Sequence, residues 1–114
     1  MRTVWVANES GHDYGPAEQY GEVKRLTLGD QNTFRLDRLL AHIARGICKF
    51  SHEDDYLLVS GSPIINAIAF QVWLQAHPQC NLLRRRAKSR EYLLNTVTRE
   101  QVERLVDKEL LGNG

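Results

Sequence analysis

Three polar segments of this chain contain residue types that can bind a phosphate or transfer a proton. The first is Ser60-Gly61-Ser62-Pro63, followed by Asn66. If a helix begins at Pro63, its first turn offers unpaired backbone N–H groups and a partial positive charge to an anion. Gly61 would let the anion approach the backbone, the two serines would donate hydroxyls, and Asn66 would contact a base or sugar. The alternative is local, with Ser62 as helix cap, Gly61 as turn residue and Asn66 bonded to a neighbouring loop.

The second segment is the loop that begins Asn8-Glu9-Ser10 and continues Gly11-His12-Asp13. A histidine beside an aspartate can act as an acid/base group or orient a ligand, so His12 is the candidate catalytic residue. Asn8, Ser10 and Asp13 are further candidate ligand contacts. The alternative is a polar loop in which Asp13 caps the short turn that follows.

The third segment, Arg84-Arg85-Arg86-Ala87-Lys88-Ser89-Arg90, is strongly basic. On an extended strand the residues at 84, 86, 88 and 90 would share one face, and Arg86 is the candidate ligand contact. Paired guanidinium groups suit the phosphates of a nucleotide or an oligonucleotide. The alternative is a solvated edge strand whose charges oppose aggregation, partly neutralised by Glu91 and the acidic run at 53–55.

Alternating strand and helix signals predict the elements that position these segments. Short β-rich runs predict strands at residues 3–7, 22–28, 56–60 and 80–86, and residues 91–95 extend the last strand or return beside it. Helices are predicted at 34–49, with Thr33 or Asn32 as N-cap, and at 63–76. A capping box at Thr98 and Gln101 begins a last helix that Gly112 ends, and residues 16–20 form one helical turn.

This alternation predicts a small three-layer, Rossmann-like α/β domain over residues 1–114, with a mostly parallel sheet of four or five strands. In such a sheet the loops that follow the parallel strands lie at one edge, where α/β proteins place their ligands. We therefore expect the three polar segments to meet at the carboxyl edge of the sheet.

The helix at 63–76 is apolar nearly all round, with Asn66, Gln71 and Gln75 as its strongly polar residues. It must be buried on more than one side, either inside the domain or against another copy of the chain. A homodimer is therefore one expectation.

Composition narrows the function classes. The net charge is +1, so the overall basic excess of a dedicated nucleic-acid binder is absent. Cys48 and Cys80 are expected to be buried thiols in a reducing cytoplasm and not a bridge. No apolar run reaches the roughly 20 residues of a membrane span. His12, His42 and His77 are scattered, so we expect neither a metal nor another cofactor.

Three functions remain, in decreasing order of support. The first is binding of a phosphorylated or nucleotide-like ligand at the sheet edge. The second is a non-catalytic, homodimeric interaction module. The third is a small phosphodiesterase or nuclease that uses His12 as acid/base and the basic strand for phosphate.

Overall fold

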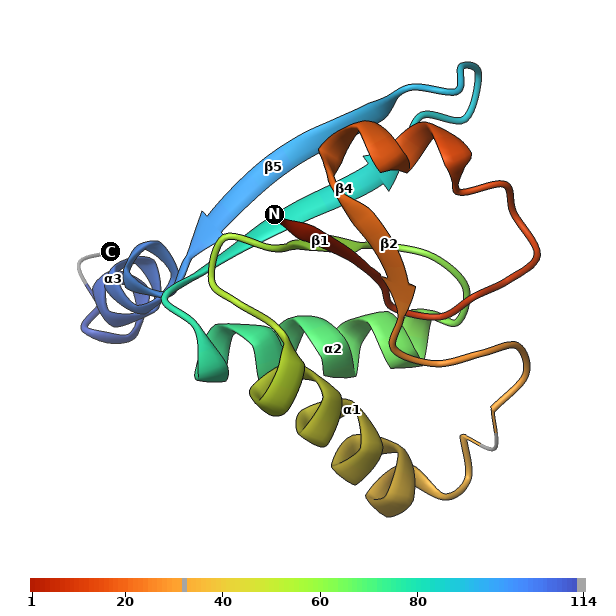
Figure 1. Ribbon diagram of the computed structural model, residues 1–114. Coiled ribbons are helices and arrows are strands. Elements are labelled where there is room, and N and C mark those ends of the chain that lie inside the picture. Colours follow the sequence, from red (N-terminus) through yellow and green to blue (C-terminus); the bar gives the residue numbers. More distant parts are fainter. Residues whose placement is uncertain (32, 113–114) are drawn as a thin grey trace.

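The computed structural model describes residues 1–31 and 33–112 and contains one five-stranded sheet in the order β2-β1-β3-β4-β5 (Figure 1). The strands are β1 (Thr3–Val6), β2 (Glu22–Arg25), β3 (Tyr56–Leu58), β4 (Gln79–Arg85) and β5 (Tyr92–Thr98). The helices are the 3₁₀ helix η1 (Gly15–Tyr20), α1 (Leu36–Phe50), α2 (Pro63–Ala76) and α3 (Arg99–Leu110). The first four strands are parallel and β5 is antiparallel to β4. The predicted α/β class with a mostly parallel sheet is confirmed.

The handedness of the crossovers decides which face each helix covers. The chain moves from β1 to β2 in one direction, and then passes over β1 to β3 in the other. Right-handed connections therefore place η1 on one face and α1 on the opposite face, and the step from β3 to β4 places α2 beside α1. Figure 1 shows this arrangement, with α1 and α2 together under the sheet. The layer opposite them is thin, because it is the six-residue η1.

Alternation along the central strands divides the core between the two faces. On β1, Trp5 points toward α1 and α2, whereas Val4 and Val6 point toward η1. On β3, Leu57 joins the first cluster and Leu58 the second. All residues of β3 are buried, as its unbroken apolar sequence predicts for a central parallel strand.

Helix α2 is buried within the chain itself. Ser62 caps its first turn, Pro63 is its first residue, and Ala76 is its last, as the sequence predicts. Ile65, Ala69 and Trp73 are fully buried, and α2 packs against both α1 and β4. Most of the apolar surface of this helix is therefore buried within the chain, whereas Ile64 in its first turn is 47% exposed.

The start of α1 differs from its prediction. The helix begins at Leu36 with Arg35 as N-cap, and no side chain caps it; Thr33 lies in a turn, and Asn32 lies outside the described residues. Its buried face comprises Leu39, Ile43 and Ile47. Leu36 and Leu40 follow the same spacing of three and four residues, which predicts them on that face, but they are 47% and 48% exposed.

Strands β1, β2 and β3 are shorter than predicted, whereas β4 has the predicted length and is shifted by one residue. β2 stops at Arg25, although the chain beyond it stays hydrogen-bonded to the first segment: the Leu26 N–H donates to the Val6 carbonyl and the Thr27 hydroxyl donates to the Ala7 carbonyl. β3 stops at Leu58 and β4 at Arg85. Residues 86–91 then form the turn to the antiparallel β5. The predicted basic face at 84, 86, 88 and 90 is therefore wrong, because residues 86, 88 and 90 lie beyond the end of the strand.

The two cysteines are free, and they differ in environment. Cys80 is buried, and burial raises the pKa of its thiol to about 12. Cys48 is exposed on α1, so the expectation of two buried thiols is wrong for this residue. Among the described residues, no helix is both long and apolar enough to cross a bilayer.

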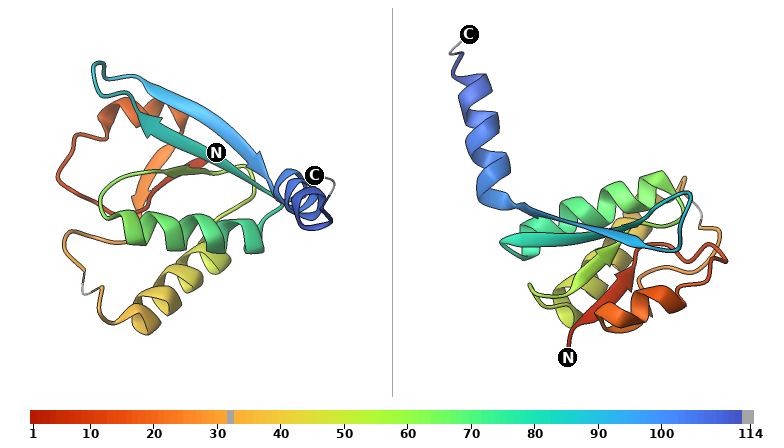
Figure 2. Two further views of the ribbon diagram at one scale, coloured as in Figure 1. Left: turned by 180° about the vertical axis from the view of Figure 1, so that it is seen from behind. Right: turned by 90° about the horizontal axis from the view of Figure 1, so that it is seen from above.

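Helix α3 extends away from the rest of the molecule, as Figure 2 shows in the view from above. The predicted capping box is present, since Thr98 accepts from the Gln101 N–H and the Gln101 side chain accepts from the Thr98 N–H. None of the residues of α3 is buried. Its apolar stripe is exposed: Val102, Leu105, Val106 and Leu110.

Candidate functional site

The loops that follow β1 and β3 meet where the crossovers leave for opposite faces of the sheet, at its topological switch point. Three hydroxyl groups contact one another there. Ser60 Oγ lies 2.7 Å from Tyr14 Oη and 3.1 Å from Ser10 Oγ, and the Ser10 N–H donates to Tyr14 Oη at 3.0 Å. Two of the predicted polar segments therefore converge, and we refer to Ser10, Tyr14 and Ser60 as the hydroxyl cluster.

Asn8 holds the loops of the switch point together. Its side chain is buried; Oδ1 accepts from the Ser62 N–H at 2.9 Å, and Nδ2 donates to Thr27 Oγ1 at 2.9 Å and to the Gly29 carbonyl at 2.8 Å. Both ends of the amide are thus bonded within the protein. Asn8 was predicted to contact a ligand, but in the structure its side chain joins three loop segments at the edge of the sheet.

Gly61 lies against Asn8 in a backbone conformation that favours glycine. Its φ is +75°, and a Cβ atom at this position would lie 2.2 Å from Asn8 Oδ1 and 2.7 Å from the Asn8 carbonyl oxygen. The residue is therefore required for the close approach of the two loops.

The first turn of α2 is largely occupied by its own side chains. The Ser62 hydroxyl accepts from the Ile65 N–H at 3.5 Å. Asn66 Oδ1 accepts from the Ser60 N–H, and its Nδ2 donates to the Ser60 and Ser62 carbonyls. Pro63 has no N–H to offer. This geometry matches the alternative in which Ser62 caps the helix and Asn66 bonds to the neighbouring loop. Few N–H donors at the start of α2 are therefore left to bind a ligand.

A cavity of about 200 Å³ opens beside the hydroxyl cluster. Three predicted residues line it, namely His12, Ser60 and Gly61. Its remaining walls come from β3, β4 and β5 and from the first loop: Tyr14, Leu58, Val59, Arg84, Arg85 and Tyr92. The cavity is thus the place where the first, second and third polar segments come together.

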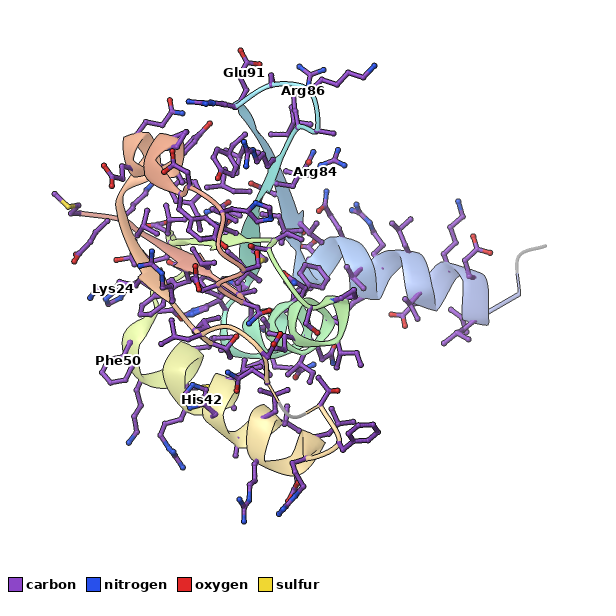
Figure 3. All side chains as sticks on the ribbon, turned by 90° about the vertical axis from the view of Figure 1, so that its right-hand side faces the viewer. Lys24, His42, Phe50, Arg84, Arg86 and Glu91 are labelled. Atoms are coloured by element: carbon purple, nitrogen blue, oxygen red, sulfur yellow. The ribbon has the colours of Figure 1, made fainter. Side chains whose placement is uncertain are left out.

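The arginines at this cavity are Arg84 and Arg85, and not Arg86. Because β4 runs parallel to β3 with Leu83 opposite Leu58, the two residues after Leu83 reach the same edge as Ser60. Arg86 lies at the hairpin tip, where its Nη1 is 3.8 Å from Glu91 Oε2 (Figure 3). Within residues 1–31 and 33–112, neither Arg84 nor Arg85 forms an ion pair.

His12 and Asp13 do not form a joined acid/base pair. Asp13 Oδ1 accepts from the Gly15 N–H at 2.9 Å, which matches its expected capping role at η1. The His12 ring meets the Tyr14 ring edge-on with centroids 6.5 Å apart. His12 lines the cavity, and among the described residues no ion pair joins it to a carboxylate.

Tyr14 and Tyr92 also belong to the site, although nothing in the sequence around them distinguishes them from aromatic core residues. Both rings are buried, yet Tyr14 contributes to the hydroxyl cluster and Tyr92 lines the cavity. Burial raises the pKa of Tyr92, and the positive charge of Arg85 opposes that shift. The Tyr92 phenol therefore stays protonated at neutral pH and can donate to an anion.

In the part of the chain that the structure describes, no group of three or more histidine, cysteine or acidic residues is arranged to hold a metal ion. The polar groups that line the cavity at the edge are the Arg84 and Arg85 guanidinium groups, hydroxyls and the His12 imidazole. These groups bind anions by charge and hydrogen bonding.

These features define a small α/β protein with a mostly parallel sheet and a polar, arginine-flanked switch point. Residues 2–98 match the family described as Phage Pam3 gp32-like protein, and the chain belongs to that family. No curated protein and no solved structure matches the chain. The family match ends at Thr98, the residue that caps α3.

Proposed function

We propose that this chain is a cytoplasmic domain that binds a phosphorylated or nucleotide-like small ligand at the carboxyl edge of its sheet. The observation that carries the proposal is the shared cavity of Arg84, Arg85, Tyr92 and Ser60. Two guanidinium groups without carboxylate partners among the described residues supply charge, and the two hydroxyls supply neutral donors. The free thiols of the two cysteines fit a reducing compartment.

The size of the cavities favours a phosphate attached to a larger group. A volume of about 200 Å³ is below the usual range for a whole small-molecule site, but it accommodates a phosphoryl group. A second cavity of about 820 Å³ is lined by η1 and β2, and it shares His12 and Tyr14 with the first. A sugar or base would occupy this second space, with the His12 and Tyr20 rings among its walls.

Replacing Arg85 by alanine is expected to weaken the binding of such a ligand by about 10- to 100-fold, because a charged hydrogen-bonding partner contributes about 1.5–3 kcal/mol. Titration calorimetry with AMP, ADP and a cyclic nucleotide measures the affinity, with adenosine as the ligand that lacks phosphate. Arg86→Ala is the matched control, since this neighbouring arginine pairs with Glu91 at the hairpin tip. It is expected to bind like the wild type.

Two results would contradict the proposal. One is the absence of heat and of thermal stabilisation with every phosphorylated ligand tested. The other is equal loss of affinity in the Arg85 and Arg86 variants, which would indicate general attraction by positive charge and no defined cavity.

A second candidate function is a homodimeric interaction module, and α3 is the observation that favours it. Its apolar stripe is exposed, with Val102 39%, Leu105 58% and Val106 46% accessible. Glu103 precedes Arg104 and Asp107 precedes Lys108 along the helix, so charges of both signs flank the stripe. A surface with both signs can complement a second copy of itself. We propose a second copy of the chain as the partner of this stripe.

Sedimentation equilibrium tests this candidate with two variants of α3. Leu105→Lys places a charge in the stripe and is expected to convert a dimer to a monomer. Leu111→Lys is the control, because this exposed leucine lies beyond the last residue of the helix and off the stripe. A wild type that remains monomeric at the highest concentration reached would overturn the candidate.

A further inference from the structure

A polar groove distinct from both of these cavities lies on the α1 side of the molecule. It shares no lining residue with the 200 Å³ cavity, and it shares Arg25 with the 820 Å³ cavity. Its volume is about 630 Å³, between helix α1 and the segment that follows β2. Its charged and ionisable walls are Arg25, Arg35, Arg38 and His42. No carboxylate lines it.

The groove continues into a basic stripe along α1. Arg35, Arg38, His42, Arg45 and Lys49 are spaced by three or four residues, so they follow one side of the helix. All five are exposed. Lys24 on the edge strand β2 adds a further cation, and Figure 3 shows it on the same side of the molecule as His42.

Little negative charge opposes this surface. Within the described ranges, the one ion pair that involves the stripe joins Arg35 Nε to Asp37 Oδ1 at 3.9 Å, and both side chains are more than half exposed. An exposed pair of this kind is weak. With Arg25 and Lys24, six of the fifteen lysines and arginines gather here in a chain whose net charge is only +1.

We propose that the groove and the basic stripe bind the phosphate backbone of a nucleic acid without reading its sequence. At 1.5 Å per residue, the stripe extends for about 21 Å, which matches about six nucleotides of one strand. The groove and the stripe together contain four arginines, whose planar forks suit phosphate oxygens: Arg25, Arg35, Arg38 and Arg45.

The alternative anionic partner, a lipid surface, fits less well. A helix that lies in a membrane interface needs an apolar face free to enter the lipid. The apolar face of α1, formed by Leu39, Ile43 and Ile47, is buried in the core. Leu36, Leu40 and Phe50 of α1 stay 47%, 48% and 64% exposed, but the buried residues Ile43 and Ile47 separate Leu36 and Leu40 from Phe50, so α1 has no continuous apolar face left to enter lipid.

Fluorescence anisotropy with a labelled single-stranded and a labelled duplex oligonucleotide tests the proposal. If four phosphates are neutralised, binding of the single strand should weaken about 50-fold between about 50 mM and about 200 mM salt. The double variant Arg38→Glu and Arg45→Glu should lower the affinity at least tenfold. Its matched control, Lys88→Glu with Arg90→Glu, changes the net charge equally at the hairpin tip and should alter the affinity less than threefold.

Circular dichroism melts of both double variants check that each is folded before binding is compared. The proposal is overturned if neither oligonucleotide binds at low salt, or if the two double variants weaken binding equally. It is also overturned if vesicles of phosphatidylserine bind the protein while both oligonucleotides fail to do so. Failure of nucleotide binding at Arg85 leaves this proposal standing, because Arg85 does not line the groove and the groove shares no lining residue with the 200 Å³ cavity.

Discussion

Replacing Asp55 by alanine is expected to lower the free energy of unfolding by about 3–5 kcal/mol. The carboxyl group is 2% exposed and accepts three hydrogen bonds. Oδ1 accepts from the Thr3 N–H at 3.0 Å, and Oδ2 accepts from Trp5 Nε1 at 3.1 Å and from the His52 N–H at 3.0 Å. Its removal leaves these donors without their acceptor. Since domains of this size are stable by only about 5–15 kcal/mol, much of the native stability would be lost.

Asp54→Ala provides the comparison for this variant. Asp54 is exposed and adjacent, and its backbone carbonyl, which faces Asn81 Nδ2, is kept in the variant. We expect a change within about 0.5 kcal/mol at this position. Urea denaturation followed by tryptophan fluorescence measures both variants. A loss below about 1 kcal/mol for Asp55→Ala would mean that Asp55 does not anchor β1 to β3 in this way.

Gly61→Ala is expected to destabilise the protein by about 2–4 kcal/mol and to abolish ligand binding at the switch point. The backbone at Gly61 has φ +75°, so any side chain adds strain. In addition, the new Cβ would collide with the side chain and the carbonyl oxygen of Asn8. Asn8 would have to leave the hydrogen bonds that join the Ser62, Thr27 and Gly29 loops.

Gly11→Ala separates the collision from the backbone strain. Gly11 has a similar φ of +83°, and nothing lies within 4 Å of the position of its Cβ. This variant is expected to lose about 1–2 kcal/mol, from the backbone conformation alone. Thermal and urea unfolding of the two variants give the difference. Equal destabilisation would show that the close approach of Gly61 to Asn8 contributes nothing.

Local sequence signals predicted most of the fold. Helix α2 was correct at both ends, because Ser62 and Pro63 begin it and Pro78 disfavours helix at His77. The capping box at Thr98 placed the start of α3 equally well. The return of residues 91–95 beside β4 was one of two predicted alternatives, and the structure confirms it. The choice between these alternatives and the outward extension of α3 could not be predicted, since strand pairing and helix docking are set by tertiary contacts.

The sequence predicted which segments meet at the candidate site more accurately than it predicted which residues line it. The loops after β1 and β3 do converge, because parallel strands bring their carboxyl ends to one edge. Which arginines reach the cavity depends on the pairing of Leu83 in β4 with Leu58 in β3. The register between two strands cannot be predicted from one basic run of sequence. Asn8 and Asn66 have the residue type of a ligand contact, but the turn at Gly61 needs their hydrogen bonds.

The most direct test of the switch-point site is a ¹H–¹⁵N correlation spectrum of the labelled protein titrated with AMP. The account predicts saturable shifts of the backbone amides of His12, Ser60, Gly61 and Arg85, which surround the cavity. It also predicts that these shifts disappear in Arg85→Ala and persist in Arg86→Ala. Shifts confined to α1 between Arg35 and Lys49, with the switch-point amides unchanged, would contradict it.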